Sequence, residues 1–174
     1  MVMMVVAMAA GCRGSSTEAT VPAGAAAADI YAEVLHRYLT TPAESSFPTD
    51  AFLMVYVLDR SFPGGGESEE KRGAGLSIPV DTQRRVVSAL ASTSRVSFIS
   101  DRRSVIVERN ACAQVKGQAI LVTLGSPASA GDVVRVGING FVACHGATWL
   151  TYLVESVPGA GWRVTGVEGH RAAA

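Results

Sequence analysis

The sequence lacks an excess of charge of either sign. Its 174 residues hold 15 lysines and arginines against 15 aspartates and glutamates, a formal net charge of +0 at pH 7. Neutralising a phosphate backbone takes a patch or stripe of Lys and Arg, and no segment gathers one. We therefore expect no nucleic acid among the partners of this protein.

Motifs for several kinds of catalysis are also absent. Gly64 to Gly66 are not followed by the Gly-Lys-Ser/Thr ending of a phosphate-binding loop. The segment Gly75 to Pro79 lacks the second glycine of a nucleophile elbow. His36, His145 and His170 share no metal-ligand spacing. The sequence thus predicts no metal site and no cofactor, and it favours a protein that is not an enzyme.

One pair of residues carries catalytic elements, Cys144-His145. A thiolate beside an imidazole can be an activated nucleophile. Neighbouring strand residues point to opposite faces, however, and no third group that would orient the imidazole is identifiable. A thiol enzyme or hydrolase is therefore the least favoured of three hypotheses, and we prefer a disulfide-bonded Cys144 beside an exposed histidine.

The chain does contain an apolar start that ends in a cysteine. Residues 1–11 are Met, Val, Ala and Gly only, and they close on Ala9-Ala10-Gly11-Cys12. This ending resembles the lipobox of bacterial lipoproteins, in which small residues fit the signal peptidase and the cysteine sulfur receives the lipid. Two features depart from that family: Ala9 stands where Leu is usual, and no Lys or Arg precedes the apolar stretch.

The length of this start excludes a lasting transmembrane anchor. A helix over residues 1–11 reaches about 16 Å at 1.5 Å per residue, whereas spanning the hydrocarbon core takes about 30 Å. The resemblance implies instead a cleaved signal peptide and a diacylglyceryl thioether at Cys12, with palmitate-like chains that contribute about 0.8 kcal/mol per buried CH₂ group. It implies a cell-membrane protein, lipid-anchored through Cys12 on the extracytoplasmic side. Two alternatives stay open: an apolar N-terminus that joins the core, and a secretory signal cleaved elsewhere.

Composition divides the chain into four parts. Residues 1–11 are the predicted signal peptide. Residues 12–28 comprise the lipidated cysteine and a flexible linker, too poor in apolar side chains to order itself; alternatively, its alanine-rich end extends the first helix. Residues 29–170 have the size of one ordinary domain with a single core. Residues 171–174 are a tail.

The predicted domain holds an even pair of cysteines, Cys112 and Cys144. Outside the cytoplasm such a pair usually oxidises. A bridge across this loop of about 33 residues would remove roughly 3 to 4 kcal/mol of denatured-state freedom. Two separate buried thiols are the alternative. A disulfide would indicate export independently of the N-terminus.

Two helices are predicted from apolar spacing. In the first, Ile30, Val34 and Tyr38 recur at helical intervals, Asp29 is the expected N-cap, and Thr41-Pro42 ends the run. The second begins near Pro79, with one apolar stripe that should face a sheet. The residues of that stripe are Val80, Val87, Leu90 and Ala91.

The remaining pattern is mainly β. A buried strand is expected over 52–58, and a surface loop over 61–75. Hairpin-linked strands are expected over 96–99, 105–108, 118–124, 133–143, 148–154 and 161–167, with turns near Gly146 and at Pro158-Gly159. We therefore predict an α+β domain: two helices on a curved, mainly antiparallel sheet of six or seven strands. This order is loosely similar to the cone-shaped NTF2-like and cystatin-like folds.

A further candidate site is an aromatic cluster among small residues. Phe141, Trp149 and Tyr152 lie in a segment rich in Gly and Ala, and such a mixture can frame a pocket. Alternatively, the small residues let a twisted sheet pack or bend. The leading functional hypothesis is a membrane-tethered, non-catalytic binding or accessory protein of the cell envelope. The second is a carrier or sensor of a small apolar ligand in an NTF2-like pocket.

Overall fold

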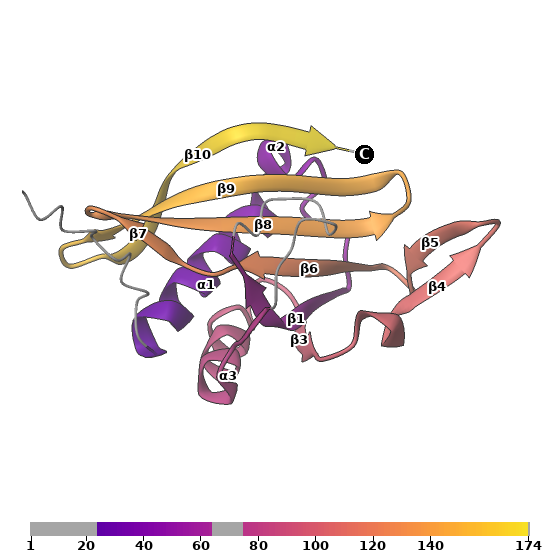
Figure 1. Cartoon of the computed structure of the whole chain (residues 1–174), viewed down its shortest axis with the longest axis horizontal. Coiled ribbons are helices and arrows are strands. Elements are labelled where there is room, and N and C mark those ends of the chain that lie inside the picture. Colours follow the sequence, from indigo (N-terminus) through magenta and orange to yellow (C-terminus); the bar gives the residue numbers. More distant parts are fainter. Residues whose placement is uncertain (1–23, 64–74, 174) are drawn as a thin grey trace, which may run out of the picture.

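Helix α1, Gly24–Thr40, is the element around which the rest of the chain is arranged (Figure 1). The computed structural model describes residues 24–63 and 75–173. Within these ranges a ten-stranded mixed sheet curls over α1. The predicted α+β class with a curved sheet is confirmed, whereas the predicted six or seven strands are too few.

Three α-helices and one 3₁₀ turn are described: α1, α2 (Pro42–Ser45), α3 (Val80–Ala89) and the turn Arg102–Ser104. The strands are β1 (Met54–Phe62), β2 (Leu76–Ser77), β3 (Val96–Ile99), β4 (Ile106–Arg109), β5 (Cys112–Val115), β6 (Ala119–Gly125), β7 (Ala128–Ala130), β8 (Val133–Ala143), β9 (Gly146–Val157) and β10 (Gly161–Ala173). The extra strands are short ones that weak periodicity did not reveal.

The first helix begins five residues earlier than Asp29, at Gly24. Asp29 therefore lies inside the helix and is not its N-cap, because the preceding alanines are strong helix formers that extend it. The helix ends at Thr40, as expected, since Pro42 disfavours helical backbone at Thr41. The alanine-rich end of the predicted linker thus belongs to α1.

The sheet is antiparallel except around β1. Its main path runs β10-β9-β8-β6-β1, and β1 is parallel to both β6 and β3. Helix α3 connects β1 to β3, which is the crossover that two parallel neighbours require. The expected run of hairpins is therefore wrong at this end of the sheet and right for β8, β9 and β10. The predicted loop over 61–75 lies largely outside the described residues.

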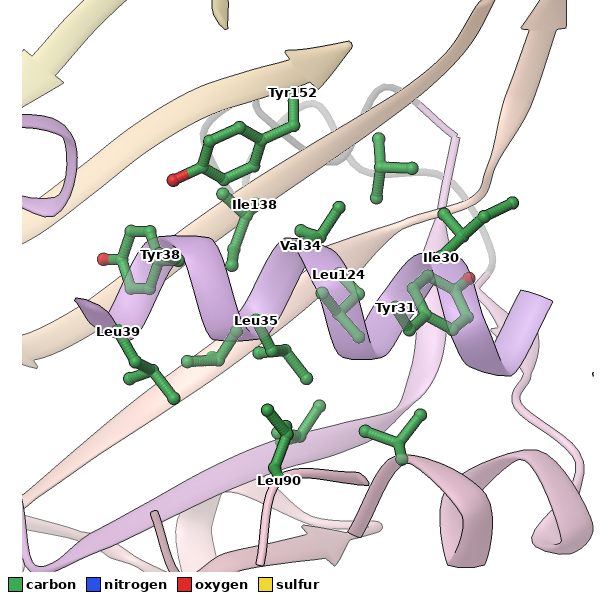
Figure 2. Close-up of a cluster of buried hydrophobic side chains, with 14 of the residues drawn as sticks. Ile30, Tyr31, Val34, Leu35, Tyr38, Leu39, Leu90, Leu124, Ile138 and Tyr152 are labelled. Atoms are coloured by element: carbon green, nitrogen blue, oxygen red, sulfur yellow. The ribbon is translucent and has the colours of Figure 1, made fainter. Parts of the chain in front are cut away.

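The main core lies between α1 and the inner face of the sheet. Figure 2 shows Ile138 and Tyr152 on one side of α1 and Leu90 on the other, so the helix is covered from both sides. A smaller cluster around Val105, Val115 and Leu121 lies on the outer face, where the β4–β5 hairpin packs.

The apolar stripe predicted for the second helix is partly wrong. Leu90 is buried, but Val80 is 65% exposed and Val87 37% exposed. Helix α3 turns a different face inward, with Thr82 and Val86 buried against the core. Since α3 covers the sheet only near its edge, one side of the helix remains uncovered.

Candidate functional site

The two domain cysteines form a disulfide. The Cys112–Cys144 Sγ atoms are 2.06 Å apart, and the bridge links the start of β5 to the turn between β8 and β9. The prediction of a disulfide is confirmed. His145, next in the same turn, is exposed. While the bridge is intact, Cys144 has no thiolate with which to attack a substrate.

The three aromatic residues of the predicted pocket lie on two faces of the sheet. Tyr152 is fully buried in the main core beneath α1. Phe141 packs against the outer cluster. Trp149 alternates with the buried inner residues Thr148 and Leu150, so it also faces outward. These side chains therefore do not line one common cavity.

Gly140 explains why small residues occur in this segment. A Cβ atom built at this position would collide with the hydroxyl oxygen of Tyr38 and crowd Ile120. The Tyr38 hydroxyl makes a 2.5 Å hydrogen bond with Thr148 on the next strand. The glycine thus lets α1 approach the sheet closely, which is the packing role considered for it.

A buried polar cluster closes the C-terminal end of α1. The Arg37 guanidinium binds the Glu44 carboxylate through Nε and Nη2, at distances from 2.6 to 3.2 Å. The Tyr152 hydroxyl has no partner in hydrogen-bond geometry. Burial raises the pKa of Tyr152 above its ordinary value, and the Glu44 charge raises that pKa further. The Arg37–Glu44 ion pair thus links α1 to α2.

A small apolar pocket opens at the other end of α1. Its volume is about 190 Å³. Its walls come from the start of α1, from β2 and α3, and from the end of β6. The lining residues are Gly24, Ala27, Tyr31, Ser61, Leu76, Ser77, Ile78, Pro79, Thr82, Ser126 and Pro127.

Hydroxyl groups mark the polar end of this pocket. Ser61 Oγ and Ser126 Oγ are 3.0 Å apart, and the Tyr31 hydroxyl donates to the Gly125 carbonyl at 3.3 Å. Burial raises the pKa of Tyr31 to about 12, so the phenol is neutral at physiological pH. Among the residues that the structure describes, no charged group lines the pocket. The arrangement suits a small uncharged molecule with an apolar body and one polar end.

A second hollow, of about 320 Å³, lies between α1, the end of α3 and the β9–β10 turn. Its carboxylates are paired with arginines: Glu33 Oε2 lies 3.5 Å from Arg163 Nη1, and Asp29 Oδ1 lies 3.3 Å from Arg85 Nη2. Since these groups neutralise one another, the hollow shows no charge preference for a ligand.

Sequence reasoning did not find the apolar pocket. Ser61 and Ser126 are 65 positions apart in the chain, and only the parallel pairing of β1 with β6 brings them together. The sole local signal was the hydroxyl side chain at the end of each strand. Cys12 lies outside the described residues, as does the side chain of His170.

Within residues 24–63 and 75–173, no three His, Cys, Asp or Glu side chains gather in a way that could hold a metal ion. The helices found there are also too short or too polar to cross a membrane. Comparison of the chain with protein-family models, with curated proteins and with solved structures finds no match.

Proposed function

We propose that this chain is a lipid-anchored protein of the extracytoplasmic side of the cell membrane, whose folded part acts as a non-catalytic binding or accessory component of the cell envelope. The anchor is the thioether at Cys12, and residues 1–11 are a signal peptide that is cleaved from the chain. A curved sheet that wraps a helix, as in NTF2-like and cystatin-like folds, is the scaffold of this proposal.

The disulfide is the observation that carries this proposal. Bridges such as Cys112–Cys144 persist in oxidising compartments and are rare in the cytosol. The bridge lies about 100 residues from the lipobox-like Ala9 to Cys12, so the two features are independent indications of export. Cys144 is held in the disulfide and is not free to act as a nucleophile beside His145, which is in keeping with a role in binding.

The test is acylation of the full chain in a bacterial host that carries the lipoprotein-processing enzymes. Cells are fed an alkyne-tagged palmitate, and the mass of the N-terminal peptide is measured from membranes. We expect label and a diacylglyceryl mass at Cys12, and a Cys12→Ser variant that is unlabelled and released from membranes.

The matched control is a variant with Cys112→Ser and Cys144→Ser. It removes two other cysteines, and we expect it to keep both the label and its place in the membrane fraction. A Cys12→Ser variant that sediments with membranes like the unchanged protein would refute the anchor. A free cytosolic thiol at Cys112 or Cys144 in the native host would refute export.

The apolar pocket favours a second candidate function, carriage or sensing of a small apolar ligand. An empty apolar cavity of about 150 Å³ is enough to hold benzene, and the pocket beside Tyr31 measures about 190 Å³. The hydroxyls of Tyr31, Ser61 and Ser126 would bind one polar group of such a ligand. Ligands of the size of phenol or cyclohexanol fit this description.

Phenol titration of the full chain, followed by NMR, tests this second function. We expect saturable shifts at Tyr31 and Ile78, and their loss in Ser126→Leu, which fills the cavity from a half-buried position. Ser156→Leu, an exposed change elsewhere, is the control. Shifts that do not saturate, or that persist in Ser126→Leu, would rule the pocket out as a binding site.

A further inference from the structure

Strand β3 forms an edge of the sheet whose outer side no strand covers among the described residues. The Val55 N–H donates to the Arg95 carbonyl at 2.9 Å, and Val55 is in register with Val96. In a parallel ladder, alternate residues direct their backbone groups toward the neighbouring strand. The N–H and C=O groups of Val96 and Phe98 therefore point away from β1, and no described residue hydrogen-bonds them.

The opposite edge of the sheet, β10, is capped at one backbone group by a side chain. The Glu33 carboxylate of α1 accepts a hydrogen bond from the Val164 N–H at 3.3 Å. Proteins commonly block such edges, since a row of unpaired backbone groups is a template for another strand. Here one edge is capped by a side chain, and the β3 edge remains open.

A groove runs along the open edge. One wall is the uncovered side of α3, where Val80, Gln83, Arg84 and Val87 follow one another at helical spacing. The other wall is β3, from Val96 to Phe98. The groove has a volume of about 300 Å³. Its apolar residues include the 65% exposed Val80 and the 37% exposed Val87.

We propose that this groove between α3 and β3, the β3 groove, binds an extended segment of a partner protein, which adds to the sheet as a further strand next to β3. Another backbone in extended conformation supplies donors and acceptors at the spacing of Val96 and Phe98. Alternate side chains of the segment enter the groove against Val80 and Val87. The inference rests on the proposed binding function and names its class of partner.

The dimensions of the groove set the length of the segment. Val80 and Val87 are seven positions apart on α3, which is about 10 Å along the helix axis. An extended chain rises about 3.3 Å per residue, so three to four residues of the partner fill the groove. This length matches the four residues of β3. The partner segment therefore carries two apolar side chains at alternate positions.

Charge points to a partner segment that carries an acidic residue. Arg84 is exposed on the groove wall, where it pairs with Asp81, and the exposed Arg95 precedes β3 without an acidic partner among the residues described. An acidic side chain of the partner segment opposite Arg95 would form an opposite-charge pair with it, and such cross-strand pairs stabilise sheets. An acidic residue beside the apolar ones completes the partner segment.

A displayed library of random ten-residue peptides tests this proposal. The full chain, purified from membranes in detergent, selects binders after the library has been depleted on a Val87→Lys variant. Lysine at this exposed position puts a charge in the groove and leaves the core unchanged. We expect enriched peptides with alternating apolar residues and a flanking Asp or Glu, which bind Val87→Lys at least about tenfold more weakly.

Val157→Lys is the matched control, because Val157 has the same 37% exposure as Val87 but lies at the β9–β10 turn. It should bind the selected peptides like the unchanged chain. A second test replaces peptide amides one at a time by N-methyl amides. Methylation at alternate positions should abolish binding, since it removes the donors that face β3, while methylation between them should be tolerated.

Three outcomes overturn the proposal: no enrichment over the depleted library, equal binding by Val87→Lys, or binding insensitive to every N-methylation. A concentration-dependent dimer that is abolished by Val87→Lys would also overturn it, because the occupant would then be a second copy. None of these outcomes bears on acylation at Cys12, so failure here is distinguishable from failure of the proposed anchor.

Discussion

At the scale of single residues, two glycines of the β8–β9 hairpin differ in how much space a side chain would have. Gly140 lies against the hydroxyl oxygen of Tyr38, whereas a Cβ atom on Gly146 would come no nearer than 3.6 Å to any neighbour. We predict that Gly140→Ala lowers the free energy of unfolding by about 1–3 kcal/mol, because it overpacks a buried contact. Gly146→Ala should change it by less than about 0.5 kcal/mol.

Urea unfolding at neutral pH measures both changes. Equal stability of the two variants would mean that Tyr38 can leave its place beneath β8 without loss.

The buried phenol of Tyr31 predicts a pH dependence. Burial raises its pKa from 10.0 to about 12. The folded protein holds this proton more tightly than the unfolded chain. The stability that the protonated Tyr31 phenol contributes is therefore complete below pH 10 and is lost between pH 10 and 12. That shift corresponds to about 3 kcal/mol.

Unfolding by urea between pH 9 and pH 11.5 measures this loss. Tyr31→Phe should lose less stability than the unchanged chain over the same range. Parallel pH profiles of the two proteins would contradict the assignment of this loss to Tyr31.

At the scale of elements, the β4–β5 hairpin is held by few contacts. Its strands pair with each other, but only Gln114 pairs with the rest of the sheet, opposite Ala143. The Cys112–Cys144 disulfide joins the hairpin covalently to the β8–β9 turn, and Val105 and Val115 pack in the outer cluster. The hairpin projects from the end of the sheet in Figure 1.

Replacing both Cys112 and Cys144 by Ala should therefore loosen this hairpin before the core. For a loop of about 33 residues the loss of global stability is roughly 3 to 4 kcal/mol in the chain-entropy model. Hydrogen exchange should accelerate most over 106–115, while the amides of α1 exchange only as fast as global unfolding allows. Equal acceleration in the hairpin and in α1 would show that the bridge does not fasten a local unit.

The sequence predicts those elements whose pattern is set by neighbouring residues, and it does not predict features that depend on pairing between distant segments. The bounds of β8, 133–143, follow from local alternation and a turn, and they agree with the structure. The parallel pairing of β1 with β3 and β6 could not be predicted, because a short apolar run reads the same in either direction. The exposure of Val80 could not be predicted either, because it depends on where the sheet ends beneath α3. The pocket beside Tyr31 and the β3 groove both need that long-range pairing, so neither was predicted.

At the scale of the whole molecule, the numbers of acidic and basic residues are equal, and many of these side chains also pair with each other locally. Ion pairs within the described ranges join acidic and basic side chains of several elements. They include Arg37–Glu44, Arg60–Asp59, Arg84–Asp81, Arg85–Asp29, Arg103–Asp101, Arg135–Glu168 and Arg163–Glu33. The side chains paired in this way present no net charge to an anionic membrane.

This balance bears on the membrane attachment that we propose. Stable anchoring takes two signals, either two acyl chains or one chain with a polybasic patch. With 15 basic and 15 acidic residues the chain has no net positive charge to act as a second signal, so we assign the attachment to the two chains proposed at Cys12.

We therefore predict that attachment of the unchanged protein resists both low and high salt, and that Cys12→Ser is released at either. Sedimentation of membranes in about 20 mM and about 1 M salt measures the difference, because ions screen exposed charges weakly at the lower concentration and strongly at the higher one. A Cys12→Ser variant retained at low salt and washed off at high salt would show that electrostatic attraction anchors this molecule, since only exposed charges are screened by ions.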